Sequence, residues 1–152
     1  MRRKPRAQNK IKNYTSNVPV SRTITKIEEA LAEIGATHIA KEYKDRAVSG
    51  ITFSLPFNGG HPAYCIPAQP EVVYDILTKD KRIQERAVSS YQEQAQRTAW
   101  KIVGDWVEVQ CAMVRLKQAE PMQVFFSCLL HKGETIYQRF VASGGKLLGS
   151  GE

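Results

Sequence analysis

Two pairs of histidine and cysteine residues have a spacing that a metal ion could use. His61 and Cys65 are four residues apart, and Cys128 and His131 are three apart. Imidazole nitrogen and thiolate sulfur are zinc ligands, and two such pairs would complete a tetrahedral site. However, residues 61–65 have the pattern of a β-strand rather than of a zinc knuckle, and the two pairs lie far apart in the sequence. We therefore predict no metal site, and interpret the cysteines as mostly buried thiols and the histidines as surface residues.

The other residues that could support catalysis lack the surroundings that catalysis requires. No family signature of a cysteine nucleophile surrounds Cys65, Cys111 or Cys128. The run Gly144-Gly145-Lys146 lacks the upstream glycine and the following helix of a phosphate-binding loop. We predict no catalytic residue and no cofactor, so the expected function is not enzymatic. A nuclease or other hydrolase is the third class to consider.

Basic side chains remain as candidate functional groups, and they form two clusters. Residues 1–12 carry six of the 22 lysine and arginine residues and no acid. The rest of the chain has 16 basic and 15 acidic residues, so its net charge is close to zero. The net charge of +7 therefore belongs mainly to an N-terminal arm. Basic arms neutralise phosphates and release counterions, which gives affinity for nucleic acid without sequence preference. A solubilising tail is the alternative interpretation.

The second cluster lies in residues 79–86, which also contain Asp80 and Glu85. Mixed charge of this kind favours a solvated connector, with a phosphate-binding patch as the alternative. The predicted nucleic-acid-binding residues are the basic side chains of both clusters: Arg2, Arg3, Lys4, Arg6, Lys10, Lys12, Lys79, Lys81, Arg82 and Arg86.

The spacing of apolar residues changes near Gly35 from the period of a helix to that of a strand. Glycine suits the left-handed backbone position that commonly follows the end of a helix. The helix is predicted from apolar residues at helical spacing: Ile24, Ile27, Leu31 and Ile34. Residues 37–43, 51–57 and 61–66 predict the strands of an antiparallel meander, with turns at 44–46 and 58–60. Strict alternation assigns Phe53 and Phe57 to the core, and the aromatic motif of sheet-based RNA-binding domains is absent.

The rest of the chain is predicted to be mainly helical. Pro70 begins a short helix, with Val73, Ile76 and Leu77 on its apolar face. The longest helix is predicted over about residues 90–119 and is apolar over most of its circumference, so Trp100 and Trp106 are both expected in the core or in an interface between subunits. Its only continuous polar stripe consists of Arg97, Lys101, Asp105, Glu108 and Arg115.

Three shorter elements follow the long helix. Pro121 ends that helix or begins the next one. The apolar run over residues 122–130 favours a helix, with a buried strand as the alternative. Lys132-Gly133 predicts a turn, and Thr135 with Gln138 predicts a capping box at the start of a last helix.

The expected organisation is a flexible basic arm over residues 1–20, one domain over 21–143 and a flexible tail over 144–152. The fold class is α+β: a helix, a small antiparallel three-stranded sheet and a mainly helical C-terminal half built on one long central helix. No apolar run approaches the ~20 residues that span a bilayer. Three cysteines without close spacing suit a reducing compartment. We expect a cytoplasmic protein without a membrane partner.

Two stretches of the sequence have a distinctive order of residues. The first is Thr15-Ser16-Asn17-Val18-Pro19-Val20-Ser21-Arg22-Thr23-Ile24, followed by Ile27-Glu28-Glu29 and Ile34-Gly35-Ala36. The second is Arg97-Thr98-Ala99-Trp100-Lys101-Ile102-Val103, which continues through Asp105-Trp106-Val107-Glu108. Both resemble a group of short, uncharacterised proteins of bacteriophages, prophages and other mobile elements. The resemblance covers most of residues 15–140 and implies a mobile-element origin and a bacterial host, but it brings no established catalytic residues.

These observations predict a non-enzymatic nucleic-acid-associated accessory protein, or a subunit of a nucleoprotein complex, that contacts phosphates through its basic arm. Either DNA or RNA fits this expectation, and so does an additional protein partner or self-association. The alternative is a phage counter-defence or regulatory protein that binds a host protein or a small nucleotide.

Overall fold

The computed structural model describes residues 12–146, and their contacts group into two compact units. Unit 1 contains the described residues up to 29 together with residues 68–108. Unit 2 contains residues 30–67 and the described residues from 109 onward. The predicted order of elements is confirmed: a helix, a three-stranded antiparallel sheet, and then a mainly helical second half with one long helix. The single domain expected over residues 21–143 stays a prediction.

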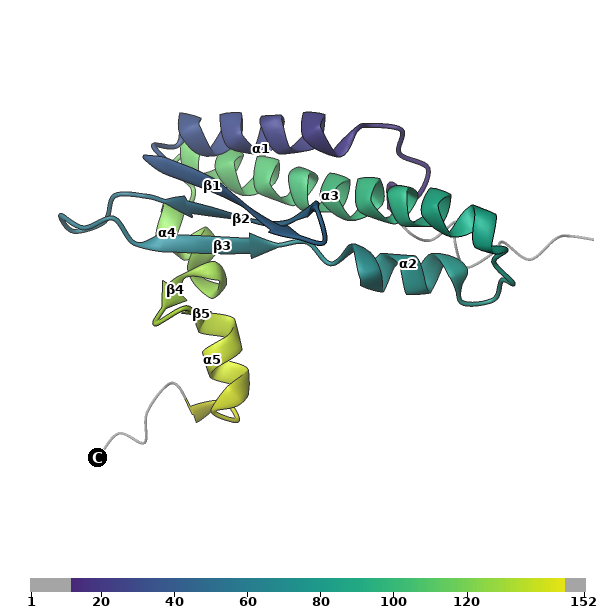
Figure 1. The fold of residues 1–152 in the computed structure, drawn as a ribbon. Helices are drawn as coiled ribbons and strands as arrows, with labels where there is room; N and C mark the ends of the chain where they lie inside the picture. Colours follow the sequence, from purple (N-terminus) through teal and green to yellow (C-terminus); the bar gives the residue numbers. More distant parts are fainter. Residues whose placement is uncertain (1–11, 147–152) are drawn as a thin grey trace, which may run out of the picture. The chain divides into compact units, whose positions relative to one another are not determined.

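Unit 1 is built on helices. It contains most of α1 (Val20–Glu33), all of α2 (Pro70–Thr78) and most of α3 (Glu85–Arg115). Figure 1 shows the first part of α1 beside α3. Gly104 allows this approach, because a Cβ at this position would lie 2.8 Å from Cγ2 of Thr23. Ile24 and Ile27 of α1 are fully buried, which confirms the predicted apolar face of this helix.

The long helix α3 has a narrower buried face than its composition suggested. Trp100 is completely buried, whereas 38% of Trp106 is exposed. A position of Trp106 in the core is therefore wrong, whereas its place in an interface between subunits stays a prediction. The buried positions of α3 follow helical spacing along one stripe: Ala95, Thr98, Ala99, Trp100, Gly104, Val107 and Cys111. No helix within residues 12–146 combines the length and the hydropathy needed to cross a membrane.

Helix α2 begins at Pro70 as predicted, because proline at the first helical position has no backbone N–H to leave unsatisfied. Of its predicted apolar face, only Leu77 is fully buried, and Ile76 is half-exposed. Hydrophobic spacing thus located the helix correctly but overstated how many of its side chains are covered.

Unit 2 contains the predicted sheet. Strands β1 (His38–Lys44), β2 (Ala47–Ser54) and β3 (Ala63–Pro67) are antiparallel and lie in the order β1-β2-β3. Asp45 and Arg46, both with positive φ, form the tight turn between β1 and β2. The alternation in β2 is real, since Ile51 and Phe53 are buried. Phe57 breaks it, because it lies beyond β2 in the turn that pairs with Gly60 and is 47% exposed.

Aromatic side chains cover the inner face of this sheet. The rings of Phe53 and Tyr64 are stacked with their centroids 5.2 Å apart. Phe125 packs edge-on against Phe53 at the same centroid distance and is itself completely buried. Phe125 belongs to α4 (Pro121–Phe125), so the burial of this one ring ties the short helix to the sheet.

The chain after α4 passes along the free edge of β3. A 3-10 turn, Phe126–Cys128, follows α4, and Leu129 then forms an antiparallel bridge with Tyr64. Strands β4 (Leu130–His131) and β5 (Glu134–Thr135) form a hairpin, and α5 spans Ile136–Ala142. The predicted capping box of Thr135 and Gln138 is present at the start of α5. Residues 122–130 thus begin as a helix and end as a bridge, which explains why their pattern fitted both.

Candidate nucleic-acid interface

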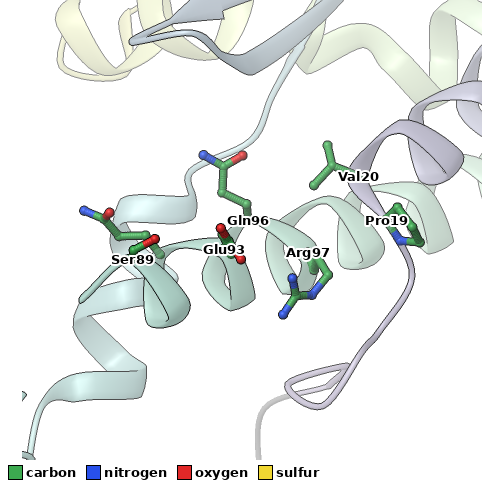
Figure 2. Close-up of a pocket in the computed structure, with 7 residues that line it drawn as sticks. Pro19, Val20, Ser89, Glu93, Gln96 and Arg97 are labelled. Atoms are coloured by element: carbon green, nitrogen blue, oxygen red, sulfur yellow. The ribbon is translucent and has the colours of Figure 1, made fainter. Parts of the chain in front are cut away.

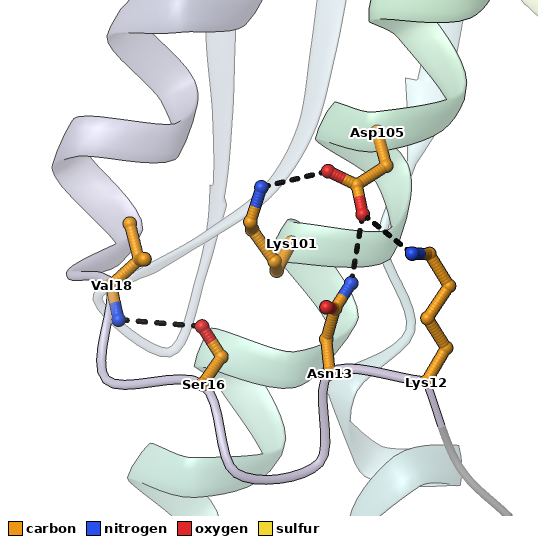
Figure 3. Close-up of polar contacts among 6 residues, drawn as sticks. All are labelled: Lys12, Asn13, Ser16, Val18, Lys101 and Asp105. Atoms are coloured by element: carbon orange, nitrogen blue, oxygen red, sulfur yellow. Dashed lines mark hydrogen bonds and ion pairs between the residues drawn. The ribbon is translucent and has the colours of Figure 1, made fainter.

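Residues 12–17, here called the docked segment, lie along the polar stripe of α3. Asn13 is the main contact (Figure 3): its Nδ2 donates to Oδ2 of Asp105 over 2.9 Å, and its carbonyl accepts from Oγ1 of Thr98 over 3.2 Å. The docked segment and the three residues after it fall within residues 1–20, which the sequence predicted as a flexible arm. The polar stripe of α3 is therefore partly covered by the protein's own chain.

Gln94 and Arg97 bind the backbone of the docked segment. Nε2 of Gln94 donates to the carbonyl oxygens of Tyr14 at 2.7 Å and Ser16 at 3.2 Å. Nε of Arg97 also donates to the Ser16 carbonyl, at 3.2 Å, while another nitrogen of its guanidinium donates to Oε1 of Gln94. These side chains satisfy carbonyl groups that have no place in a helix or a sheet, so an irregular segment can lie against the helix without losing hydrogen bonds.

Asp105 is the electrostatic centre of this contact. Its carboxylate accepts from Nζ of Lys101 at 2.7 Å and forms an ion pair with Lys12 at 3.2 Å, in addition to the bond from Asn13. Burial acts to raise the pKa of the carboxyl group, but the bonds from Lys101, Asn13 and Lys12 outweigh it and lower the pKa from 3.8 to about 2. Asp105 is therefore ionised at every physiological pH, and one of the predicted phosphate-binding residues, Lys12, has an internal partner.

The docked segment also lines a surface hollow with the second basic cluster. This hollow has a volume of about 430 Å³. Its lining comes from the docked segment, from Leu77 at the end of α2, from the connector and from the start of α3: Tyr14, Thr15, Asn17, Leu77, Lys81, Tyr91 and Gln94. Nζ of Lys81 lies 4.9 Å from the centre of the Tyr91 ring and donates to the Tyr91 hydroxyl over 3.1 Å. Lys81 is thus held in place by a cation–π contact and a hydrogen bond.

A second hollow shares Lys81 and Tyr91 with the first. It has a volume of about 460 Å³, and Arg82 and Arg86 contribute two further cations to its lining. Three of the four basic residues predicted in the connector therefore lie around one surface, which we call the Tyr91 surface: Tyr14, Lys81, Arg82, Arg86 and Tyr91. Lys79 is exposed and lines neither hollow. Arg2, Arg3, Lys4, Arg6 and Lys10 lie outside the described residues.

Another hollow, on a different part of α3, has less suitable chemistry for phosphate. Figure 2 shows it between the start of α1 and the first half of α3, with Pro19 and Val20 on one side and Ser89, Glu93, Gln96 and Arg97 on the other. Glu93 brings a negative charge, and Arg97 already donates to the docked segment. We therefore do not include this hollow in the interface.

Two of the residues considered as zinc ligands do come close to each other. An ionised Cys128 contributes to raising the pKa of Cys65, although burial is the larger cause. The thiols are only partly buried, in contrast to the fully buried Cys111. Within residues 12–146, no group of three or more histidine, cysteine or acidic side chains could hold a metal ion. His61 and His131 are exposed, as expected from the sequence.

Sequence patterns did not show which residues organise this interface or what they bind. Gln94 and Asp105 act on a segment roughly 80 to 90 positions earlier in the chain, which no periodicity within α3 could show. Tyr91 lies in the first turns of α3, close to the start of the helix predicted over about residues 90–119. One available signal was the interruption of the basic arm at Asn13 and Tyr14, where hydrogen-bonding and aromatic residues replace lysine and arginine. No protein-family model matches the chain, and neither a curated protein nor a solved structure matches it.

Proposed function

We propose that this protein is a non-enzymatic nucleic-acid-binding accessory protein, or a subunit of a nucleoprotein complex, that works in the cytoplasm of a bacterial host and originates from a mobile element. One observation carries the proposal. Tyr14 of the docked segment lines the same hollow as Lys81, and Lys81 lines a second hollow with Arg82 and Arg86. The Tyr91 surface thus gathers three basic side chains, and the basic residues 1–11 directly precede the docked segment in the sequence. We infer that both clusters contribute to one phosphate-binding region.

The charges in this region favour anionic partners such as phosphates over basic or neutral partners. Residues 1–11 carry five basic side chains and no acid. Arg82 and Arg86 are exposed, and no salt bridge to either is found among the described residues. Lys12, by contrast, is paired with Asp105, so we assign it to docking rather than to phosphate contact. Each cation that neutralises a phosphate releases a counterion, which makes the affinity depend on salt.

The experiment measures affinity for a short oligonucleotide at several salt concentrations. Deleting residues 1–11 leaves the docked segment intact and removes five positive charges. For a duplex, the slope of log affinity against log salt should become shallower by up to about 4 to 5, since each lost phosphate contact contributes about 0.9. The double variant Arg82→Ala/Arg86→Ala should reduce it by up to about 2.

A matched control distinguishes this region from general basic charge. Arg22 and Lys26 are exposed on α1, and the variant Arg22→Ala/Lys26→Ala removes the same charge as the connector double variant. We expect it to leave the slope almost unchanged. Equal losses in the two double variants would show that net charge alone governs binding. No loss after deletion of residues 1–11 would refute the proposed function.

A further inference from the structure

The bridge between Tyr64 and Leu129 brings two cysteines close together. Cys65 follows Tyr64 and Cys128 precedes Leu129, so in this antiparallel bridge the two cysteines lie on the same side of the bridged pair. Directly opposed residues in such a pairing have Cα atoms about 4.5 to 5.5 Å apart. A disulfide needs Cα atoms about 4.4 to 6.8 Å apart. The bridged pair has this spacing, and a small shift of the 3-10 turn that ends at Cys128 would bring the adjacent cysteines to it.

The sheet also directs Cys65 to a face where its thiol is accessible. Tyr64 and Ile66 point to the buried inner face, so Cys65 between them belongs to the outer face. Two observations agree with this: its register partner is Thr52, and its Sγ lies 3.9 Å from a carboxylate oxygen of Glu42. Cys128 ends the 3-10 turn and is likewise only partly buried.

The acidity of Cys65 depends in part on Cys128. Burial raises the pKa of Cys65, and the negative charges of Glu42 and of an ionised Cys128 raise it further. This electrostatic effect agrees with the short separation that the bridge between Tyr64 and Leu129 implies. The pKa of Cys128 is also raised, mainly by burial. Both thiols therefore carry little thiolate at neutral pH, and their oxidation should be slow.

We propose that Cys65 and Cys128 form a reversible disulfide, which joins β3 to the chain that follows α4. The oxidant is a low-molecular-mass disulfide such as glutathione disulfide. The thiolate of one cysteine attacks this disulfide, forms a mixed disulfide and releases one glutathione thiolate. The other cysteine, after losing its proton, attacks the mixed disulfide and releases the second glutathione. The two protein thiols lose two electrons to the oxidant, and their two protons end on the released thiols.

The bond would close a loop of more than sixty residues and would hold the segment of β4, β5 and α5 to the edge of β3. Disulfides that close loops of this length stabilise mainly by restricting the unfolded chain. We therefore expect the oxidised protein to melt several degrees higher than the reduced protein. Cys111 is a natural internal control, because it is completely buried and burial raises its pKa to about 11.

The test uses the full-length protein incubated with glutathione disulfide, with the remaining thiols then blocked by N-ethylmaleimide. Trypsin cleavage after lysine and arginine places the three cysteines in separate peptides, 47–79, 102–115 and 118–132. We expect a linked pair of peptides 47–79 and 118–132, an alkylated Cys111, and full reversal by dithiothreitol. Cys65→Ser or Cys128→Ser should abolish the link, and Cys111→Ser should leave it unchanged.

Other outcomes would overturn the proposal. They are alkylation of all three thiols after prolonged oxidation, a link that includes Cys111, or glutathione attached to Cys65 without transfer to Cys128. Peptide mapping of the wild-type protein decides between them even if a serine variant fails to fold. The result does not depend on nucleic-acid binding, so this inference and the proposed function can fail separately.

Discussion

The side-chain amide of Asn13 donates to the carboxylate of Asp105 over 2.9 Å, although the two residues are 92 positions apart in the chain. Asp105 also accepts a hydrogen bond from Lys101 and pairs with Lys12, so the polar stripe of α3 binds the docked segment. The polar face of α3 is therefore an intramolecular binding surface.

The first prediction concerns Asp105→Asn. The pKa of Asp105 in the folded protein is about 2, below its ordinary 3.8, so its ionised form stabilises the fold above about pH 4. This contribution is lost as the pH falls from about 4 to 2. We expect the variant to lose about 2 kcal/mol of unfolding free energy at pH 7, and the difference from wild type to vanish near pH 2.

Denaturant unfolding at several pH values measures this difference. Asp75→Asn is the matched control, because Asp75 is exposed on α2 and should lose little at any pH. A deficit of Asp105→Asn that persists undiminished at pH 2 would mean that its cause is not the charge of Asp105.

The second prediction concerns attachment of the docked segment. Gln94→Ala removes the donor to the carbonyl oxygens of Tyr14 and Ser16. Two lost hydrogen bonds should raise the population of the detached segment about tenfold or more, since each contributes about 0.5 to 1.5 kcal/mol. Trypsin should then cleave after Lys12 correspondingly faster. Gln92→Ala, at an exposed position on the same helix, should be cleaved at the wild-type rate. Equal rates for the two variants would argue against a docked segment.

Local signals in the sequence predicted much of the fold. Gly35 after α1, Pro70 and Pro121 at helix starts, and the Thr135–Gln138 box each act within a few residues of their own position. The extent of α3 and its single buried stripe could not be predicted this way. Which apolar side chains are covered depends on segments elsewhere in the chain. Trp106 was therefore expected in the core or in an interface, and Ile76 on an apolar face, although both are partly exposed.

The candidate site was predicted less completely than the fold. The basic residues of the connector were found from the sequence, because they lie close together in the chain. It did not show that Lys81 lies over Tyr91, or that Tyr14 lines the same hollow, since both contacts arise only when the chain is folded. The proximity of Cys65 and Cys128, on which the proposed disulfide depends, was hidden for the same reason: it follows from a bridge between Tyr64 and Leu129, 65 positions later.

A third prediction compares the two tryptophans. Trp100→Ala removes a completely buried indole and should cost about 3 to 5 kcal/mol of unfolding free energy. Trp106→Ala removes a side chain that is 38% exposed, and we expect roughly half that cost or less. Urea denaturation of both variants tests the order. Equal destabilisation would return Trp106 to the core, or to an interface between subunits that a change in oligomeric state would reveal.

The fourth prediction concerns the contact of α1 with α3. Gly104→Ala places a Cβ 2.8 Å from Cγ2 of Thr23, which should cost about 1 to 3 kcal/mol despite the better helix propensity of alanine. Thr23→Ser removes that methyl group. The double variant should therefore be more stable than the sum of the two single effects, by about 1 kcal/mol or more, in denaturant unfolding. Strict additivity would mean that the helices separate to accept the methyl group.

The docked segment also has a consequence for the order in which the protein folds. Its hydrogen bonds to α3 join residues 78 to 92 positions apart, whereas a tight turn at Asp45 and Arg46 joins β1 to β2. Short loops close early and long-range contacts form late. The docked segment should therefore attach last, after α3 has folded and positioned the side chains that bind it. It should also detach first, in a local opening that leaves the helices and the sheet intact.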